Sequence, residues 1–265
     1  MKTITRKSLL YQSGVDYGNY AINHIQGCSH GCRYPCYEAL NKIRRKEMAS
    51  FEEWMQPKIV ENSLELLDKE IPRLKDRIKT VHLCFATDPF MYGQPEVEDL
   101  TLKIITKLNE ACIKCVVLTK GILPKDLAIG EYSLENEYGI TLVSLDSEFQ
   151  KKFEPGAVSL DRRIESLKYL HDQGLRTWVS IEPYPTPNII IQDLSELLEE
   201  IKFVDKIVFG AWNYSPLASV YEGRQEFYLD CVKELKEFCE KNKIEPHVKI
   251  KGKEFDEFRN AGIFQ

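Results

Sequence analysis

Three cysteines stand close together near the start of the chain. They are Cys28, Cys32 and Cys36, in the segment GCSHGCRYPCYEA that covers residues 27–39. Thiolates bind soft or borderline metals, chiefly zinc and iron–sulfur clusters. A [4Fe–4S] cluster usually takes four cysteines, so a cluster held by three leaves one iron open to a small-molecule ligand. The spacing therefore predicts a metal centre with one position available for a ligand.

A structural zinc site is the alternative for the same residues. Such a site takes four protein ligands in a closed tetrahedron, and His24 or His30 could supply the fourth beside the three cysteines. The paired Cys-x2-Cys spacing typical of structural zinc sites is missing from this segment. The cluster is favoured on that ground, and zinc stays the competing hypothesis.

The elements that position this segment can be predicted from apolar periodicity. Six short runs rich in valine, isoleucine and threonine have the composition of strands: 20–27, 80–87, 113–120, 139–146, 175–183 and 206–212. Between them, apolar residues recur at three- and four-residue steps and predict helices, as at Val97, Leu100, Ile104 and Leu108. Strands that alternate with helices indicate parallel β/α units with right-handed crossovers. The pattern predicts an α/β fold, either an open layered sheet or a complete or partial barrel.

In both of these arrangements, functional residues collect at the carboxyl ends of the strands. Four of the six runs end in residues that can do chemistry: Gly27–Cys28, Thr87–Asp88, Thr119–Lys120 and Ser180–Glu182. Ser144 and Asp146 close a fifth run on one face. We therefore expect the metal centre and a ligand pocket at one edge of the sheet.

The cysteine segment resembles that of the radical S-adenosylmethionine (SAM) enzymes, whose usual spacing after the first strand is C-x3-C-x2-C. The nearer likeness is to the spore photoproduct lyase-like branch, also called DNA repair photolyase-like. It extends over roughly residues 18–215, through the following matching segments: FATDPF and the downstream Glu96 (85–96), Thr119–Lys120, FEPGAVSLDRR (153–163) and HDQGL before the fifth run. The resemblance implies a partial (β/α)6 barrel of parallel strands with outer helices.

One residue departs from the family pattern. Pro35 lengthens the second cysteine spacing and gives C-x3-C-x3-C. Proline fixes its own backbone and restricts the preceding Tyr34. Because loops absorb single insertions easily, the segment is expected to bulge around the same cluster.

The resemblance also places the whole chain, 1–265, in a single radical SAM domain, with the core at about 18–215 and a C-terminal helix and basic extension over 216–265.

The resemblance further implies a set of cofactor contacts. Cys28, Cys32 and Cys36 would hold a [4Fe–4S] cluster, and the amino and carboxylate groups of SAM would chelate its open iron. The reduced cluster would cleave SAM to methionine and a 5′-deoxyadenosyl radical, which abstracts hydrogen from a substrate. The expected SAM contacts are these strand-end and loop residues: Tyr37, Thr87, Asp88, Lys120, Ser144 and Glu182.

Several of these residues have structural alternatives. Lys120 suits the SAM carboxylate because its ammonium is a point charge on a long stem, but it could also be solvated. Asp88 could form an Asx turn into the next loop, and Asp146 could cap the turn that follows it. Cys84 is offset by one residue from the strand-two cysteine that donates hydrogen in spore photoproduct lyase, so no donor role is assigned to it.

Composition limits the class of protein. The formal net charge is −5, which is not the charge of a protein that coats nucleic acid through charge alone. No apolar run is long enough to span a bilayer, and the first residues lack the apolar core of a secretory signal. We therefore expect a cytoplasmic protein that does not associate with a membrane. In that compartment its eight cysteines should be reduced thiols.

The resemblance and the charge distribution indicate which partners the protein would need. Radical SAM chemistry implies a one-electron donor of the flavodoxin or ferredoxin type. The substrate is open between a nucleic acid, for which local basic clusters at 42–46, 73–79 and 247–253 offer contacts, and a peptide or small metabolite. A second hypothesis is a non-catalytic zinc- or iron–sulfur-binding module for electron transfer or partner binding. It predicts bound metal without affinity for SAM. The sequence does not define an oligomeric state.

Overall fold

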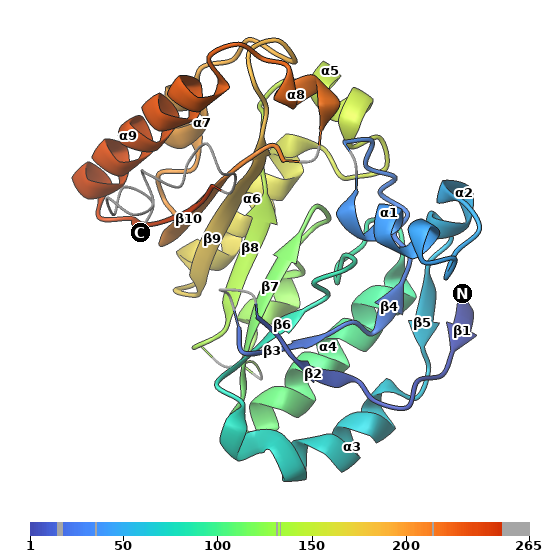
Figure 1. Ribbon diagram of the computed structural model, residues 1–265. Helices are drawn as coiled ribbons and strands as arrows, with labels where there is room; N and C mark the ends of the chain where they lie inside the picture. The colour runs from blue at the N-terminus through green and yellow to red at the C-terminus, as the bar shows by residue number, and fades with distance from the viewer. Residues whose placement is uncertain (15–17, 35, 131, 133, 214, 251–265) are drawn as a thin grey trace.

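A sheet of parallel strands with helices along its outer side forms the body of the protein (Figure 1). This computed structural model describes residues 1–14, 18–34, 36–130, 132, 134–213 and 215–250. The eight strands of the main sheet follow the order β11-β10-β9-β8-β7-β6-β3-β2, and its two edges do not pair with each other. Every neighbouring pair from β3 to β11 is parallel, whereas β2 and β3 are antiparallel. The predicted α/β fold and partial barrel of parallel strands are confirmed.

Six of the eight strands of the main sheet overlap the six predicted runs, with β8 and β9 displaced along the chain, whereas β2 and β11 were not among those runs. The eight strands are β2 (Leu10–Gln12), β3 (Tyr20–Ile22), β6 (Thr80–Leu83), β7 (Lys114–Thr119), β8 (Glu137–Thr141), β9 (Arg176–Tyr184), β10 (Lys206–Ala211) and β11 (Glu245–Lys249). One predicted strand was wrong in its extent. The run 20–27 is divided, because β3 joins the main sheet and β4 (Ile25–Gln26) joins a second sheet.

The second sheet is small and lies beside the start of the cysteine segment. Its order is β1-β5-β4, with β1 (Lys2–Ile4) parallel to β5 (Lys58–Val60) and β4 antiparallel to β5. Strands of two or three residues carry too few side chains to show a period of two, so the sequence did not reveal this sheet. It anchors the chain immediately before Cys28.

Helices cover the outer side of the main sheet and bury apolar stripes against it (Figure 1). The helices of eight or more residues are α1 (Tyr37–Arg44), α3 (Ser63–Leu74), α4 (Pro95–Glu110), α6 (Leu160–Asp172) and α9 (Arg224–Asn242). The shorter ones are α2 (Phe51–Trp54), α5 (Ser147–Phe153), α7 (Leu194–Glu200), α8 (Pro216–Ser219) and the 3-10 turns η1 (Lys75–Arg77) and η2 (Lys125–Ala128). The stripe predicted for 97–108 is confirmed, because all four of its residues are buried in α4. None of the described helices has both the length and the apolar character needed to cross a membrane. The cytoplasmic location stays a prediction.

An aromatic side chain packs on the inner side of the curved sheet, close to the amino ends of the strands. Trp178 of β9 packs across the strand next to it, where Gly139 of β8 leaves room for the indole ring. A Cβ at Gly139 would lie 2.4 Å from that ring, so only glycine fits this position. Val116 and Val208 complete the cluster around the indole.

Candidate functional site

The cysteine segment runs from β4 into α1, beyond the carboxyl ends of the parallel strands. Its first residues are fixed by close backbone contact with the small helix α2. The Cys28 N–H donates to the Trp54 carbonyl over 2.9 Å. Gly27 has φ +88°, and a Cβ there would stand 2.5 Å from the same carbonyl oxygen, so glycine is required. Cys36 occupies the N-cap of α1. Pro35, which lengthens the family spacing, lies outside the described residues.

A distant segment closes over the other side of the cysteine loop. The Gly156 N–H donates to the His30 carbonyl over 2.9 Å, and the Arg33 N–H donates to the Phe153 carbonyl over 2.7 Å. A Cβ on Gly156 would come within 2.5 Å of the Ser29 carbonyl oxygen. The FEPG segment after α5 therefore holds the loop that carries the three cysteines.

The three thiols influence one another electrostatically. Burial raises the pKa of Cys28 well above its usual value, and Asp88 and the other two cysteines raise it further. Burial likewise raises the pKa of Cys32 to about 12, an effect opposed by Lys120. Burial also raises the pKa of Cys36, while backbone N–H groups and Lys120 act in the opposite direction. The thiols are therefore protonated in the metal-free protein, and metal binding must displace their protons.

The donor set fits an iron–sulfur cluster better than a single ion. All three cysteines are free thiols of intermediate exposure in one loop, and thiolates are the usual ligands of such clusters. His24 and His30, the two residues that could complete a zinc site, are both buried and engaged in other hydrogen bonds.

A buried carboxylate organises the cationic side of the loop. Glu154 is 2 % exposed and pairs with Arg163 over 2.6 Å, between Oε2 and a guanidinium nitrogen. The Tyr34 hydroxyl donates to the other oxygen, Oε1. Burial acts to raise the pKa of Glu154, but Arg163, Lys120 and the Tyr34 hydrogen bond outweigh burial and lower it. Glu154 is therefore an anion inside the protein.

Lys120 lies between this carboxylate and the thiols. Its Nζ stands 3.9 Å from Glu154 Oε1 and 5.4 Å from the centre of the Tyr34 ring, in a cation–π arrangement. Its side chain is mostly buried, so the solvated alternative does not describe it. The ammonium lowers the pKa of both Cys32 and Cys36. A cation is thus held beside the cysteine loop, and its contact with the SAM carboxylate stays a prediction.

Asp88 has a structural role in the loop after β6. Its carboxylate accepts hydrogen bonds from four groups: the Phe90 N–H, the Thr119 hydroxyl, the Lys120 N–H and His30 Nδ1. The bond from Phe90 forms the Asx turn that was the alternative for this residue. Because the Tyr92 N–H donates to His30 Nε2 over 3.0 Å, the ring proton is on Nδ1 and points to Asp88. Asp88 therefore connects β7 to the cysteine loop.

The other predicted contacts lie around the same edge of the sheet. Thr87 is half-buried in the loop after β6, and Tyr37 is exposed at the first position of α1. Ser144 is buried after β8 and accepts from the Asp146 N–H. Asp146 caps α5 by accepting from the Glu148 and Phe149 N–H groups, as its structural alternative predicted.

Glu182 lies on a different part of the inner face. Its Oε2 pairs with Lys249 Nζ of β11 over 2.8 Å. The two residues meet across Gly210 of β10, where a Cβ would come within 2.7 Å of the Glu182 side chain. The basic segment 247–253 is described only to residue 250 and contributes this lysine to the inner side of the sheet.

A hydrogen-bonded chain fixes Cys84 at the end of β6. The Thr101 hydroxyl donates to the Pro89 carbonyl, so its oxygen accepts from His24 Nε2 over 2.7 Å. His24 Nδ1 then accepts from the Cys84 thiol over 3.3 Å. Burial lowers the pKa of His24 to about 3 and raises that of Cys84 to about 12, so both groups are neutral. Cys84 is not an activated thiolate.

Sequence reasoning missed the importance of Glu154 and Tyr34. They are 120 positions apart, so no local spacing joins them. The only available signal was the position of Glu154 in the FEPGAVSLDRR segment, which the resemblance singled out without a role for the carboxylate. His30 was considered only as a zinc ligand.

Comparison with known proteins places the chain in a family. A family model described as the radical SAM superfamily matches residues 22–201. An uncharacterized protein of Acidianus two-tailed virus is 25% identical over 191 residues, which are 69% of this chain and 61% of that protein. The chain thus spans less than two thirds of the length of this relative.

Two solved structures have a similar fold at low sequence identity. Spore photoproduct lyase complexed with dinucleoside spore photoproduct matches with a TM-score of 0.69 and 13% identity, over 93% of this chain and 81% of that chain. Streptococcus suis SuiB bound to S-adenosylmethionine matches with a TM-score of 0.55 and 16% identity, over 89% of this chain and 48% of that chain.

Proposed function

Because the chain belongs to the radical SAM superfamily, we propose that it cleaves SAM reductively at an iron–sulfur cluster held by Cys28, Cys32 and Cys36. The observation that carries the proposal is the position of Lys120, a mostly buried ammonium beside a loop of three free thiols. Three thiolates leave the fourth iron of a [4Fe–4S] cluster open to SAM. When bound and reduced, the cluster supplies the electron that cleaves SAM to methionine and a 5′-deoxyadenosyl radical, which abstracts hydrogen from the substrate.

The protein's own residues bind and orient the reactants. Lys120 offers its ammonium to the SAM carboxylate, and Glu154 and the Tyr34 ring hold that ammonium in place. The hydrogen bonds to Asp88 keep the end of β7 against the cysteine loop. Tyr37, Thr87, Ser144 and Glu182 are proposed to contact the rest of SAM from the strand ends and the loop.

For the substrate we propose a nucleic acid. Support comes from the fold, since the solved lyase with a TM-score of 0.69 is complexed with a dinucleoside photoproduct. The competing class is a peptide, because a further SuiB structure, with a TM-score of 0.52, is bound to a precursor peptide. Fold similarity alone does not define a substrate, so the proposal for the substrate depends on experiment. The electron donor is proposed to be a flavodoxin or ferredoxin.

SAM cleavage is the direct test of this activity. Protein reconstituted with iron and sulfide without oxygen is reduced with dithionite, and 5′-deoxyadenosine is measured after addition of SAM. We expect formation by the wild-type protein and none by Cys32→Ala. Metal-loaded wild-type protein that forms no 5′-deoxyadenosine would support the non-catalytic module instead.

The substrate class is tested with the same reaction. Deuterated DNA, RNA and peptide are offered separately, and deuterium in 5′-deoxyadenosine identifies the molecule that loses hydrogen. Transfer from DNA or RNA supports the proposal, whereas transfer from peptide alone contradicts it.

A further inference from the structure

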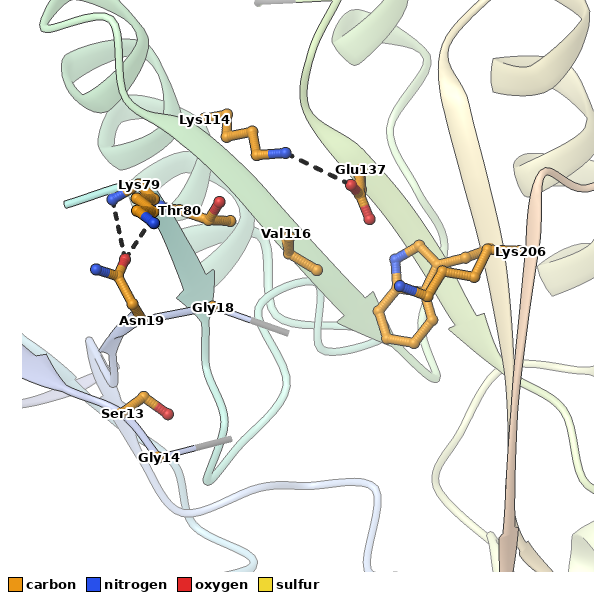
Figure 2. A pocket seen from close by; sticks show the side chains of 11 residues that line it. Ser13, Gly14, Gly18, Asn19, Lys79, Thr80, Lys114, Val116, Glu137 and Lys206 are labelled. Atoms are coloured by element: carbon orange, nitrogen blue, oxygen red, sulfur yellow. Dashed lines mark hydrogen bonds and ion pairs between the residues drawn. The ribbon is translucent and has the colours of Figure 1, made fainter. Parts of the chain in front are cut away.

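A hollow at the opposite end of the sheet forms a second candidate site. Its volume is about 550 Å³, and it lies at the amino ends of the parallel strands (Figure 2). Thr80, Lys114, Glu137 and Lys206 are the first residues of β6, β7, β8 and β10, and all of them line it. The cysteine loop lies beyond the carboxyl ends of these strands, at the other end of the sheet. We propose that this hollow binds a small organic anion that carries a phosphate or carboxylate group. The proposal does not depend on the function proposed above.

The walls of the hollow are held by hydrogen bonds within the protein. Asn19 Oδ1 accepts from the Lys79 N–H over 2.9 Å and from the Thr80 N–H over 3.2 Å (Figure 2). Its Nδ2 donates to the Arg77 carbonyl over 2.7 Å. A Cβ on Gly18 would stand 3.2 Å from the Thr80 carbonyl oxygen, so the residues just before β3 lie tightly against the start of β6. The amide of Asn19 therefore fixes one wall in advance of any ligand.

Among the residues that the structure describes around the hollow, positive charge exceeds negative charge. Lys114 and Arg176 share Glu137, at 3.7 and 3.6 Å, and Arg176 and Lys206 share Glu245, at 2.6 and 3.3 Å. These linked ion pairs comprise five charged side chains, of which three are cations and two are carboxylates. Lys79 adds a fourth cation, which has no ion pair with any residue that the structure describes. The excess of two positive charges favours an anion in a protein whose overall charge is negative.

The composition of the lining defines the class of ligand. Lysine ammonium groups bind phosphate and carboxylate as point charges. Val116 and the indole of Trp178 give the inner part an apolar surface, which suits an organic body rather than a bare ion. The volume lies within the range of about 300 to 1,000 Å³ found for small-molecule sites. A molecule the size of a nucleoside monophosphate meets all three requirements.

The site is tested by measuring the binding of three anions: adenosine monophosphate, citrate and inorganic pyrophosphate. The protein is loaded with its cluster, and SAM is present in excess. Isothermal titration calorimetry at low salt measures each affinity. We expect saturable binding of at least one of these anions. The variant Lys79→Met should weaken it at least tenfold, because an exposed cation of the lining is removed without breaking any ion pair in the described chain.

Two matched variants define where the anion binds. Lys69→Met removes an exposed lysine of α3 and should leave the affinity unchanged. Lys120→Met removes the cation beside the cysteine loop and should also leave it unchanged. The proposal is overturned if none of the three anions binds saturably, if Lys79→Met binds as tightly as wild type, or if only Lys120→Met weakens binding. Failure of SAM cleavage would not affect this outcome.

Discussion

Glu154 and Arg163 form an ion pair of 2.6 Å in which both side chains are almost completely buried. Arg163 also donates to the Val158 carbonyl over 2.9 Å and to the Thr141 carbonyl over 3.0 Å. The pair joins α6 to the end of β8, and through Tyr34 it reaches the cysteine loop. The candidate site therefore depends on a charge pair that lies outside the loop itself.

Removal of this buried charge should destabilise the protein. The variant Glu154→Gln leaves the Arg163 guanidinium without a counterion, and loss of one partner of a buried pair typically costs about 3 to 5 kcal/mol. The free energy of unfolding in urea measures this cost. The exposed pair of Glu148 and Lys151 supplies the control, because Glu148→Gln should leave stability unchanged. Equal stability of the two variants would contradict the structural role of Glu154.

A side chain at Gly156 should disturb the cysteine loop. The variant Gly156→Ala places a Cβ within 2.5 Å of the Ser29 carbonyl oxygen, so one of the two segments must move. We expect less iron per chain after reconstitution than in wild type, measured together with far-ultraviolet circular dichroism. Gly14→Ala is the control, since no atom of the described residues lies within 4 Å of a Cβ there. Full iron content in Gly156→Ala would show that this contact does not hold the loop.

His82 should make stability depend on pH. Burial, and to a lesser degree Lys249, lowers the pKa of His82 from 6.5 to about 4. The unfolded chain binds a proton near pH 6.5, whereas the folded protein does not until about pH 4. The stability contributed by the neutral ring is therefore complete above pH 6.5 and is lost as pH falls toward 4. A buried histidine of this kind changes the free energy of unfolding by up to about 1.4 kcal/mol per pH unit.

The variant His82→Gln removes the titrating group. We expect the free energy of unfolding to fall less steeply between pH 6.5 and 4 than in wild type, whatever its value at pH 7. Urea unfolding at several pH values gives both slopes. Identical slopes would mean that His82 is protonated in the folded protein over this range.

Lys120 should contribute to SAM affinity rather than to cluster assembly. The variant Lys120→Met keeps the length of the side chain and loses the ammonium that is proposed to meet the SAM carboxylate. We expect unchanged iron content and at least tenfold weaker SAM binding, measured by equilibrium dialysis. Lys125→Met is the matched control, because Lys125 lies over the Tyr169 ring on η2. A loss of iron with normal SAM affinity would assign Lys120 to the loop instead.

The parallel sheet was predictable because buried strands have a local signature. Runs rich in valine, isoleucine and threonine, such as Lys114–Thr119, alternate with helical stripes such as that of α4, and this alternation specifies β/α units. The extent of the first strand was not predictable, because the break after Ile22 depends on pairing with β6 on one side and β5 on the other. Pairing between distant segments leaves no local period.

The candidate site was predictable only in part, for a similar reason. The cysteines stand in one loop, so their spacing alone indicated metal chemistry. Glu154 acts through Tyr34, Lys120 and Arg163, which come from separate elements and are brought together only by the fold. From the sequence alone, Asp88 could either contact a ligand or form an Asx turn. The hydrogen bond from the Phe90 N–H shows the turn, and the other three hydrogen bonds of the carboxylate come from segments that only the fold brings near.

Electron paramagnetic resonance of the reduced protein, recorded with and without SAM, tests the central claim most directly. After reconstitution without oxygen, the account predicts about four irons per chain, little zinc, and a signal of the reduced cluster that changes when SAM is added. A protein that takes up zinc but no iron, or an iron–sulfur signal that is unchanged at saturating SAM, would contradict it.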